Sequence, residues 1–208
     1  MFSELRYLMA MFSYKSKKIK LRPVQLSDKE RSLEWRNDPE IRDMALSYRF
    51  PITQEMEESW YSKVLTGEDQ SKVYFAIDNI DDDKHIGFIH FYNIDYIASN
   101  AYFGITIGDK SEHGKGKARE AIHLLVQYGF KFLNLHKINL EVASFNSKAI
   151  RLYRSFGFKT EGILKDQLFI DGLYHDKISM AIFREEYYDL YPELKNTELN
   201  DYHSNAIT

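Results

Sequence analysis

A glycine- and lysine-rich loop carries the residues whose types and spacing are best suited to bind a ligand. It spans residues 113–119 and reads His-Gly-Lys-Gly-Lys-Ala-Arg. A predicted strand over 101–107 precedes the loop, and a predicted amphipathic helix over 116–132 follows it. The backbone N–H groups of a glycine-rich turn and a helix N-terminus point outward together and bind anions, usually phosphate. The loop therefore predicts a site for a phosphate-bearing ligand.

Two common phosphate-binding loops do not fit this segment. A P-loop has four residues between its glycines, whereas five separate Gly108 from Gly114, and Gly116 stands where a magnesium-binding hydroxyl is needed. A dinucleotide-binding loop needs a small last residue for close helix–strand packing, and Arg119 occupies that position. Each loop fails at a residue with a defined physical role.

The chain instead resembles the GNAT superfamily of acetyl-CoA-dependent N-acetyltransferases. Residues 113–118 fit the family's [QR]-x-x-G-x-[GA] motif, with His113 in place of Gln or Arg. Residues 146–158 are similar to the family's second conserved block. Leu21-Arg22-Pro23 and 35–42 resemble the branch with the ribosomal-protein alanine acetyltransferases, and 128–183 resembles bacterial spermidine N-acetyltransferases. The resemblance covers about residues 19–187.

The resemblance implies a site for acetyl-CoA, and it assigns residues to the two parts of that molecule. Residues at the loop would hold the pyrophosphate through small side chains, backbone amides and positive charge: His113, Gly114, Lys115, Gly116, Lys117, Ala118 and Arg119. The pantetheine arm would add like a strand along Ile105, Thr106 and Ile107, next to Asn146. A helix N-cap is an equally good interpretation of Asn146.

Acyl transfer to an amine needs a proton donor for the thiolate and an acceptor for the ammonium proton. By resemblance Tyr153 is the general acid, although its spacing also suits a core aromatic residue. Many relatives carry a Glu base on the strand over 101–107, where this chain has Tyr102. His90 on the preceding strand is the nearest replacement; an ordinary strand histidine, or a water chain through Asn93 or Asp95, are the alternatives.

Trp35, Arg36 and Asn37 lie where relatives shape the acceptor pocket. Arg36 could pair with a carboxylate or phosphate of the substrate, or the three residues could be a packing cluster at a helix end. A polyamine acceptor would prefer an acidic pocket. Carboxylates that could line one, or could equally form a solvated helix face, are Asp43, Glu55, Glu57 and Glu58.

Composition limits the broad class of protein. The chain has 208 residues, 44% of them hydrophobic, a net charge of −3 and no cysteine. The charge argues against nucleic-acid binding, and no apolar run approaches the ~20 residues of a membrane span. The lack of cysteine excludes a disulfide or a thiol nucleophile and is compatible with a reducing compartment. Because the sequence also shows no signal-peptide pattern, a cytoplasmic location is expected. No metal site is expected.

Hydrophobic periodicity predicts the order β-α-α-β-β-β-α-β-α-β-β, with a short further helix after residue 185. This order predicts an α+β (mixed α/β) fold of the GNAT type, with a mixed sheet of six to seven strands and about four flanking helices. The helix over 116–132 should bury Ala121, Leu125 and Phe132. Its solvated side should carry Glu120, His123 and Gln127, among others. The expected divisions are an extension over 1–18, containing a short helix over 1–12, the acetyltransferase domain over 19–187 and a tail over 188–208.

Three functions remain open at this point. The first is direct transfer of an acetyl group, in a ternary complex, from acetyl-CoA to a primary amine of a small molecule. That molecule would be a polyamine or an amino sugar, either free or nucleotide-linked. The second is acetylation of a protein N-terminus, and the third is a non-catalytic CoA-binding module. The aromatic C-terminal strands are compatible with a homodimer.

Overall fold

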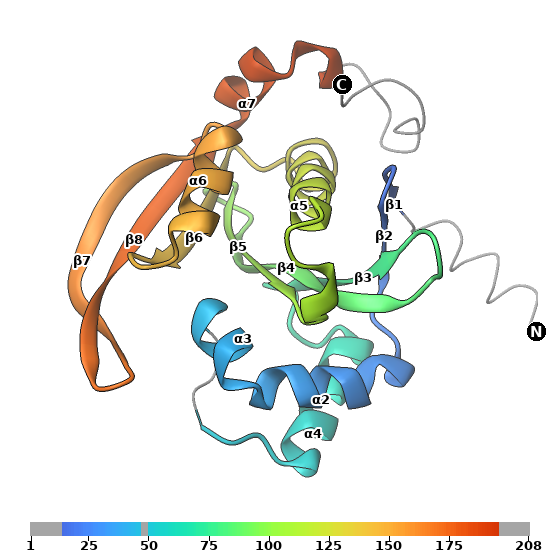
Figure 1. Ribbon diagram of the computed structural model, residues 1–208. Helices are drawn as coiled ribbons and strands as arrows, with labels where there is room; N and C mark the ends of the chain where they lie inside the picture. Colours follow the sequence, from blue (N-terminus) through green and yellow to red (C-terminus); the bar gives the residue numbers. More distant parts are fainter. Residues whose placement is uncertain (1–13, 47–49, 196–208) are drawn as a thin grey trace, which may run out of the picture.

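The computed structural model describes residues 14–46 and 50–195, and a mixed sheet of eight strands forms the centre of this part (Figure 1). The strands lie in the order β1-β2-β3-β4-β5-β6-β8-β7. Their bounds are Tyr14–Lys15 (β1), Ile19–Pro23 (β2), Val73–Asn79 (β3), His85–Asp95 (β4), Asn100–Ile107 (β5), Lys137–Ala143 (β6), Lys159–Ile170 (β7) and Leu173–Phe183 (β8). The mixed sheet is confirmed. It has one strand more than the largest number predicted, because β1 adds an edge strand.

Helices lie on both faces of the sheet (Figure 1). Helices α2, α3 and α4 cover one face, α5 and α6 cover the other, and α7 lies at the end of the sheet near the C-terminus. Their bounds are Lys29–Asn37 (α2), Pro39–Met44 (α3), Gln54–Thr66 (α4), Lys117–Gln127 (α5), Ser147–Ser155 (α6) and Arg184–Leu190 (α7). The sequence did not indicate α3, which begins with proline and is capped by the Asp38 side chain.

The two faces of the sheet differ in what they contact. Phe75, Ile89 and Phe103 point toward α5 and α6 and belong to the main core. Tyr74 and Phe88, on the alternate positions, point toward the layer of α2 to α4. Because side chains alternate along a strand, each strand delivers residues to both layers.

The outward side of α5 was predicted wrongly. Glu120, His123 and Gln127 are buried, because segments distant in sequence pack over this side of the helix. Glu120 accepts from the Lys18 N–H at 2.8 Å, and His123 Nδ1 lies 3.1 Å from the Tyr187 hydroxyl. A π-helical turn over Tyr128–Phe132 ends the helix, and its wider winding leaves Phe132 60% exposed instead of buried.

Both ends of the described chain are packed against the fold. Tyr14 of β1 is buried, and so are Tyr187 of α7 and Leu194 in the turn that follows it. The expected helix over 1–12 and the end of the expected tail, residues 196–208, lie outside the described residues.

Candidate active site

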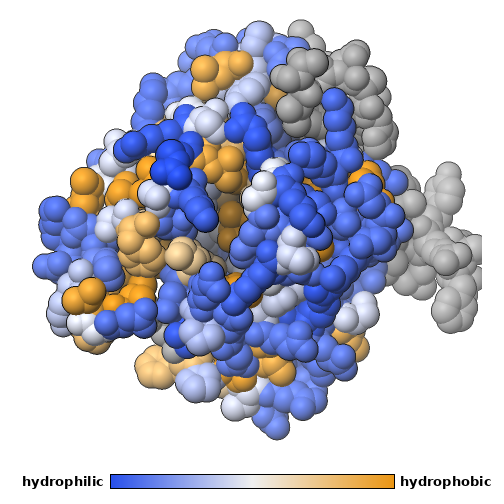
Figure 2. All heavy atoms as spheres, in the orientation of Figure 1, coloured by the Kyte–Doolittle hydropathy of each residue, from blue (hydrophilic) through white to orange (hydrophobic). Residues whose placement is uncertain are grey.

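The two parallel strands at the centre of the sheet separate partway along their length. They pair at Asn100 with Lys137, Ala101 with Ile138 and Tyr102 with Asn139, and no further. Beyond Tyr102, β5 keeps its partner β4 as far as Ile107, but its other edge faces an opening. Figure 2 shows apolar side chains recessed in a hollow between α5 and α6, on the face where this opening lies. An open strand edge can bind an extended ligand through backbone hydrogen bonds. The predicted separation of these strands is confirmed, and Ile105, Thr106 and Ile107 lie along it.

The loop before α5 forms a cradle of free backbone amides at one end of this opening. Gly114 and Gly116 have φ values of 76° and 82°, in the left-handed region that glycine tolerates best. The N–H groups of residues 116–119 donate to no backbone or side-chain acceptor within the described chain. Four unpaired N–H groups at a helix N-terminus fit a phosphate.

The charged side chains of the loop are less available than the sequence indicated. Lys117 is buried and paired with Glu112, and Lys115 lies 3.3 Å from the same carboxylate. Arg119 donates to Ser155 Oγ at 2.7 Å and lies over the Phe156 ring. Glu112 precedes the motif, so the motif alone does not reveal this neutralisation.

His113 also has an internal role. Its Nε2 lies 2.7 Å from the carbonyl oxygen of Ile107, the last residue of β5. As the donor in this hydrogen bond, His113 holds the loop against the strand that feeds it. Its ring therefore contacts the protein rather than standing free for a ligand.

Helix α6 brings Asn146 and Tyr153 to the same opening. Asn146 Oδ1 accepts from the Ala149 N–H at 3.1 Å, which confirms the predicted N-cap. The Tyr153 ring packs against Phe103 of β5 at 5.7 Å between ring centroids. Burial raises the pKa of Tyr153 to about 12. Its hydroxyl has no hydrogen-bond partner in the described chain and is not among the fully buried polar atoms, so the ring is enclosed while the hydroxyl remains accessible.

A cavity of about 190 Å³ lies on the opposite face of the sheet, beneath β4 and β5. Its walls combine the helix layer with the strands: Ser32, Trp35, Arg36, Ile41, Ala45, Trp60, Tyr74, Phe88, His90 and Thr106. Trp35, Arg36 and His90 therefore come together, as the sequence indicated. Asn37 does not line this cavity, because its side chain binds the backbone N–H and carbonyl of Ile52, each at 2.9 Å.

These features agree with the comparisons to known proteins. Residues 18–159 match the family model described as an acetyltransferase (GNAT) domain. The chain belongs to the GNAT acetyltransferase family. Helix α6, the open edge of β5 and the amide cradle are thus parts of an N-acetyltransferase that uses acetyl-CoA as the donor.

Relatives of this GNAT enzyme include acetyltransferases with two kinds of acceptor. The spermidine N(1)-acetyltransferase of Escherichia coli (strain K12) is 32% identical over 169 residues, 81% of this chain and 88% of that protein. The [ribosomal protein uS5]-alanine N-acetyltransferase of the same organism is 32% identical over 113 residues, 54% of this chain and 58% of that protein. The structure of spermidine N-acetyltransferase from Vibrio cholerae with CoA and spermine has a TM-score of 0.75 and 32% identity, and covers 81% of this chain and 97% of that one.

His90, on β4, lines the cavity and lies directly over Gly104 of β5. The two residues are register partners, and a Cβ on Gly104 would fall 2.7 Å from the imidazole. The ring stacks on Tyr74 at 4.8 Å. Burial, with a smaller contribution from Lys72, lowers the pKa of His90 to about 4. The imidazole is therefore neutral at physiological pH, and the same shift makes it a weaker base than an ordinary histidine. Asp95 was one residue of the alternative water chain. Its carboxylate instead accepts hydrogen bonds from the N–H groups of Ile97 and Ala98 in a turn.

The lowered pKa of His90 predicts the pH dependence of this GNAT enzyme. A group with a pKa of about 4 is already deprotonated above pH ~5, so its titration cannot limit the rate near neutrality. We expect log kcat/KM for an alkyl amine to rise steadily between pH 6 and 8 as free amine accumulates, with no break near 6.5. We expect His90→Gln to lower kcat by about tenfold to 100-fold without changing this slope. A break near pH 6.5 in the plot of log kcat/KM that disappears in His90→Gln would show that the pKa of His90 is not lowered.

The carboxylates considered for an acidic pocket do not line the cavity. Glu57 is fully buried and paired with Arg36, whose guanidinium lies 5.1 Å from the centroid of the Trp60 ring. Glu58 pairs with Lys29 on the surface at 2.7 Å, and Asp43 pairs with Arg42. The helix-face alternative holds for Glu58. Glu57 instead neutralises Arg36, which is the one charged side chain among the described residues that line the cavity.

Neutralisation of Arg36 has a measurable consequence for the acceptor. Glu57→Gln leaves an unbalanced guanidinium beside the cavity, and we expect KM for a cationic amine to rise about tenfold. CoA affinity should be unchanged, because α4 and the amide cradle lie on opposite faces of the sheet. Glu58→Gln, on the same helix, removes an exposed ion pair and should leave both values unchanged. An unchanged or lower KM in Glu57→Gln, with CoA binding intact, would show that Arg36 exerts no field on the acceptor.

Sequence reasoning missed Trp60 and Tyr74 as cavity walls. Neither lies in a family motif, and they meet only because α4 packs across β3, where their rings are 5.2 Å apart. Their aromatic character was visible, but nothing in the sequence placed them beside Trp35.

Within residues 14–46 and 50–195, no helix combines the length and apolar character needed to cross a membrane. No three potential metal-ligating side chains gather in the same ranges.

Proposed function

We propose that this GNAT enzyme acetylates a primary amine of a polyamine. The observation that carries the proposal is the pairing of the open β5 edge and amide cradle on one side with an aromatic cavity on the other. Acetyl-CoA supplies a thioester whose acetyl group passes to the amine and leaves a thiolate. The residues of the chain bind and orient the two substrates on the two sides of β5, and they exchange protons with them.

The proposed proton transfers use one residue from each face of the sheet. The Tyr153 hydroxyl, which is protonated at physiological pH, gives its proton to the departing thiolate. The neutral His90 imidazole takes a proton from the attacking amine, directly or through water. Both residues contact β5, Tyr153 through Phe103 and His90 over Gly104, so they flank the same stretch of strand.

The cavity suits an alkyl ammonium group for two physical reasons. Its aromatic rings attract cations through their faces, and Glu57 cancels the charge of Arg36. The relatives named spermidine N-acetyltransferases support the same acceptor class.

A panel of acceptors tests the proposal. CoA thiol release is measured with spermidine, spermine, an amino sugar, its nucleotide-linked form and a peptide with an N-terminal alanine. We expect the highest kcat/KM with the polyamines. Preference for the peptide would favour the N-terminal acetyltransferase alternative, and preference for the nucleotide-linked sugar would assign Arg36 to anion recognition. CoA binding without turnover of any amine would favour the non-catalytic module.

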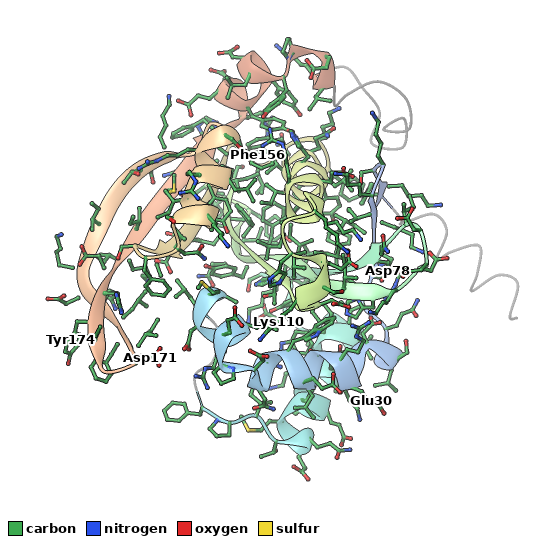
Figure 3. All side chains as sticks on the ribbon, viewed as in Figure 1. Glu30, Asp78, Lys110, Phe156, Asp171 and Tyr174 are labelled. Atoms are coloured by element: carbon green, nitrogen blue, oxygen red, sulfur yellow. The ribbon has the colours of Figure 1, made fainter. Side chains whose placement is uncertain are left out.

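We also propose a homodimer formed through the β7–β8 hairpin, and a cytoplasmic location for the enzyme. The hairpin curves away from the body, with Asp171 and Tyr174 at its tip (Figure 3). Its exposed apolar side chains include Leu164, Phe169, Leu173 and Tyr174. Exposed apolar side chains gathered on a projecting hairpin are typical of an interface. Light scattering of the wild type and Tyr174→Lys would test this arrangement, and a monomeric wild type would refute it.

A further inference from the structure

Lys18 lies beside the amide cradle although it is distant from the cradle in sequence. Its Nζ donates to the Lys115 carbonyl at 3.0 Å, across 97 positions of the chain. The same Nζ is the nearest atom to a Cβ built on Gly116, at 3.1 Å. The Lys18 ammonium group therefore lies beside Gly116, the first of the four residues whose N–H groups form the cradle.

The turn between β1 and β2 fixes Lys18 in this place. The Ser16 hydroxyl and the Lys18 N–H both donate to Glu120 Oε2 in the first turn of α5. Ser16 is buried, and its N–H donates to the Ile19 carbonyl at 2.9 Å. Glu120 thus directs its carboxylate toward the turn instead of the cradle, and it anchors Lys18 to the helix that follows the loop.

Lys18 also differs from the two lysines of the loop in its charge balance. Lys115 and Lys117 share Glu112, and Arg119 is held by Ser155 and Phe156. Lys18 has no carboxylate within ion-pair distance in the described chain, and its side chain is exposed. An ammonium that binds only a carbonyl oxygen retains two further donors and its full charge.

We propose that Lys18 binds the pyrophosphate of coenzyme A. This inference rests on the acetyl-CoA site of the proposed function. It adds a positively charged ligand, from the β1–β2 turn, to a cradle otherwise made of backbone amides. A charge-assisted hydrogen bond to phosphate is about twice as strong as a neutral one, so Lys18 supplies a substantial part of the cofactor affinity.

Calorimetric titration of CoA into the purified protein tests the assignment without relying on activity. We expect Lys18→Gln to weaken CoA binding about tenfold at low salt, and less at 1 M salt because the ionic contribution is screened. Lys18→Arg should restore most of the affinity. Lys15→Gln, an exposed lysine of the same segment, should bind like the wild type. Unchanged melting temperatures of the unliganded variants would exclude a folding effect.

Dephospho-CoA distinguishes the two kinds of phosphate in the ligand. It lacks the 3′-phosphate and keeps the pyrophosphate, so Lys18→Gln should weaken its binding by the same factor as that of CoA. A loss seen with CoA but not with dephospho-CoA would overturn the pyrophosphate assignment. Affinity of Lys18→Gln within twofold of the wild type would overturn the inference altogether. A wild type that binds no CoA would instead refute the acetyl-CoA site itself.

Discussion

Tyr153→Phe is expected to lower kcat by about 100-fold or more, with little change in CoA affinity. The hydroxyl is the accessible end of an otherwise enclosed ring, and it has no protein partner in the described chain to lose. The Phe ring can keep the contacts with Phe103 and Phe158, so folding should be preserved. Single-turnover rates and CoA titration of the same preparation separate the chemical step from binding.

Tyr128→Phe is the matched control for this substitution. Burial also raises the pKa of Tyr128 to about 12, but its ring packs with Tyr14 and Phe75, away from the β5–β6 opening. We expect wild-type kcat in Tyr128→Phe. Because Tyr153 stays protonated up to about pH 11, the wild type should show no loss of rate attributable to this residue at pH 9–10. Full activity of Tyr153→Phe would remove Tyr153 from the mechanism.

Gly116→Ala is expected to weaken CoA binding by at least about tenfold. With φ at 82°, any Cβ at this position is strained by roughly 1–2 kcal/mol, and relief of the strain rotates the N–H groups that form the cradle. The new Cβ also approaches Lys18 Nζ at 3.1 Å, so the end of that side chain has to shift slightly. Titration of CoA measures the loss directly.

Gly172→Ala provides a control with the same backbone strain in a different place. Gly172 has φ of 78° at the β7–β8 turn, and a Cβ there would meet nothing within 4 Å. Both variants should lose about 2–4 °C of melting temperature for each kcal/mol of strain, yet only Gly116→Ala should lose CoA affinity. Equal CoA affinities in the two variants would mean that the loop conformation does not determine binding.

Local signals predicted the parts of the site that depend on local structure. Asn146 caps α6, Thr53 and Gly67 bound α4, and β5 leads into the glycine loop, as their residue types indicate. The periodicity of α5 failed on its outward side because the β1–β2 turn and α7 cover it. Such coverage depends on tertiary packing between segments far apart in sequence, which a helical pattern does not contain.

The charged side chains of the loop also have partners that the sequence pattern did not reveal. Lys117 and Arg119 were expected to face phosphate, but neighbouring groups, Glu112 and Ser155, already bind them. The sequence showed the positive charges and not their partners. It also gave no reason to connect Lys18 with Gly116, since the contact exists only after β1 and β2 pair and the turn between them binds Glu120.

The central claim is direct acetyl transfer between ligands bound on the two faces of β5, without an acetylated enzyme. Initial rates measured while acetyl-CoA and spermidine are varied together test it most directly. The chain has no cysteine, and the two sites lie on opposite sides of one strand, so both substrates should be bound at once. We predict double-reciprocal lines that intersect, as a ternary complex requires. Parallel lines, the signature of a covalent acetyl-enzyme, would contradict the account.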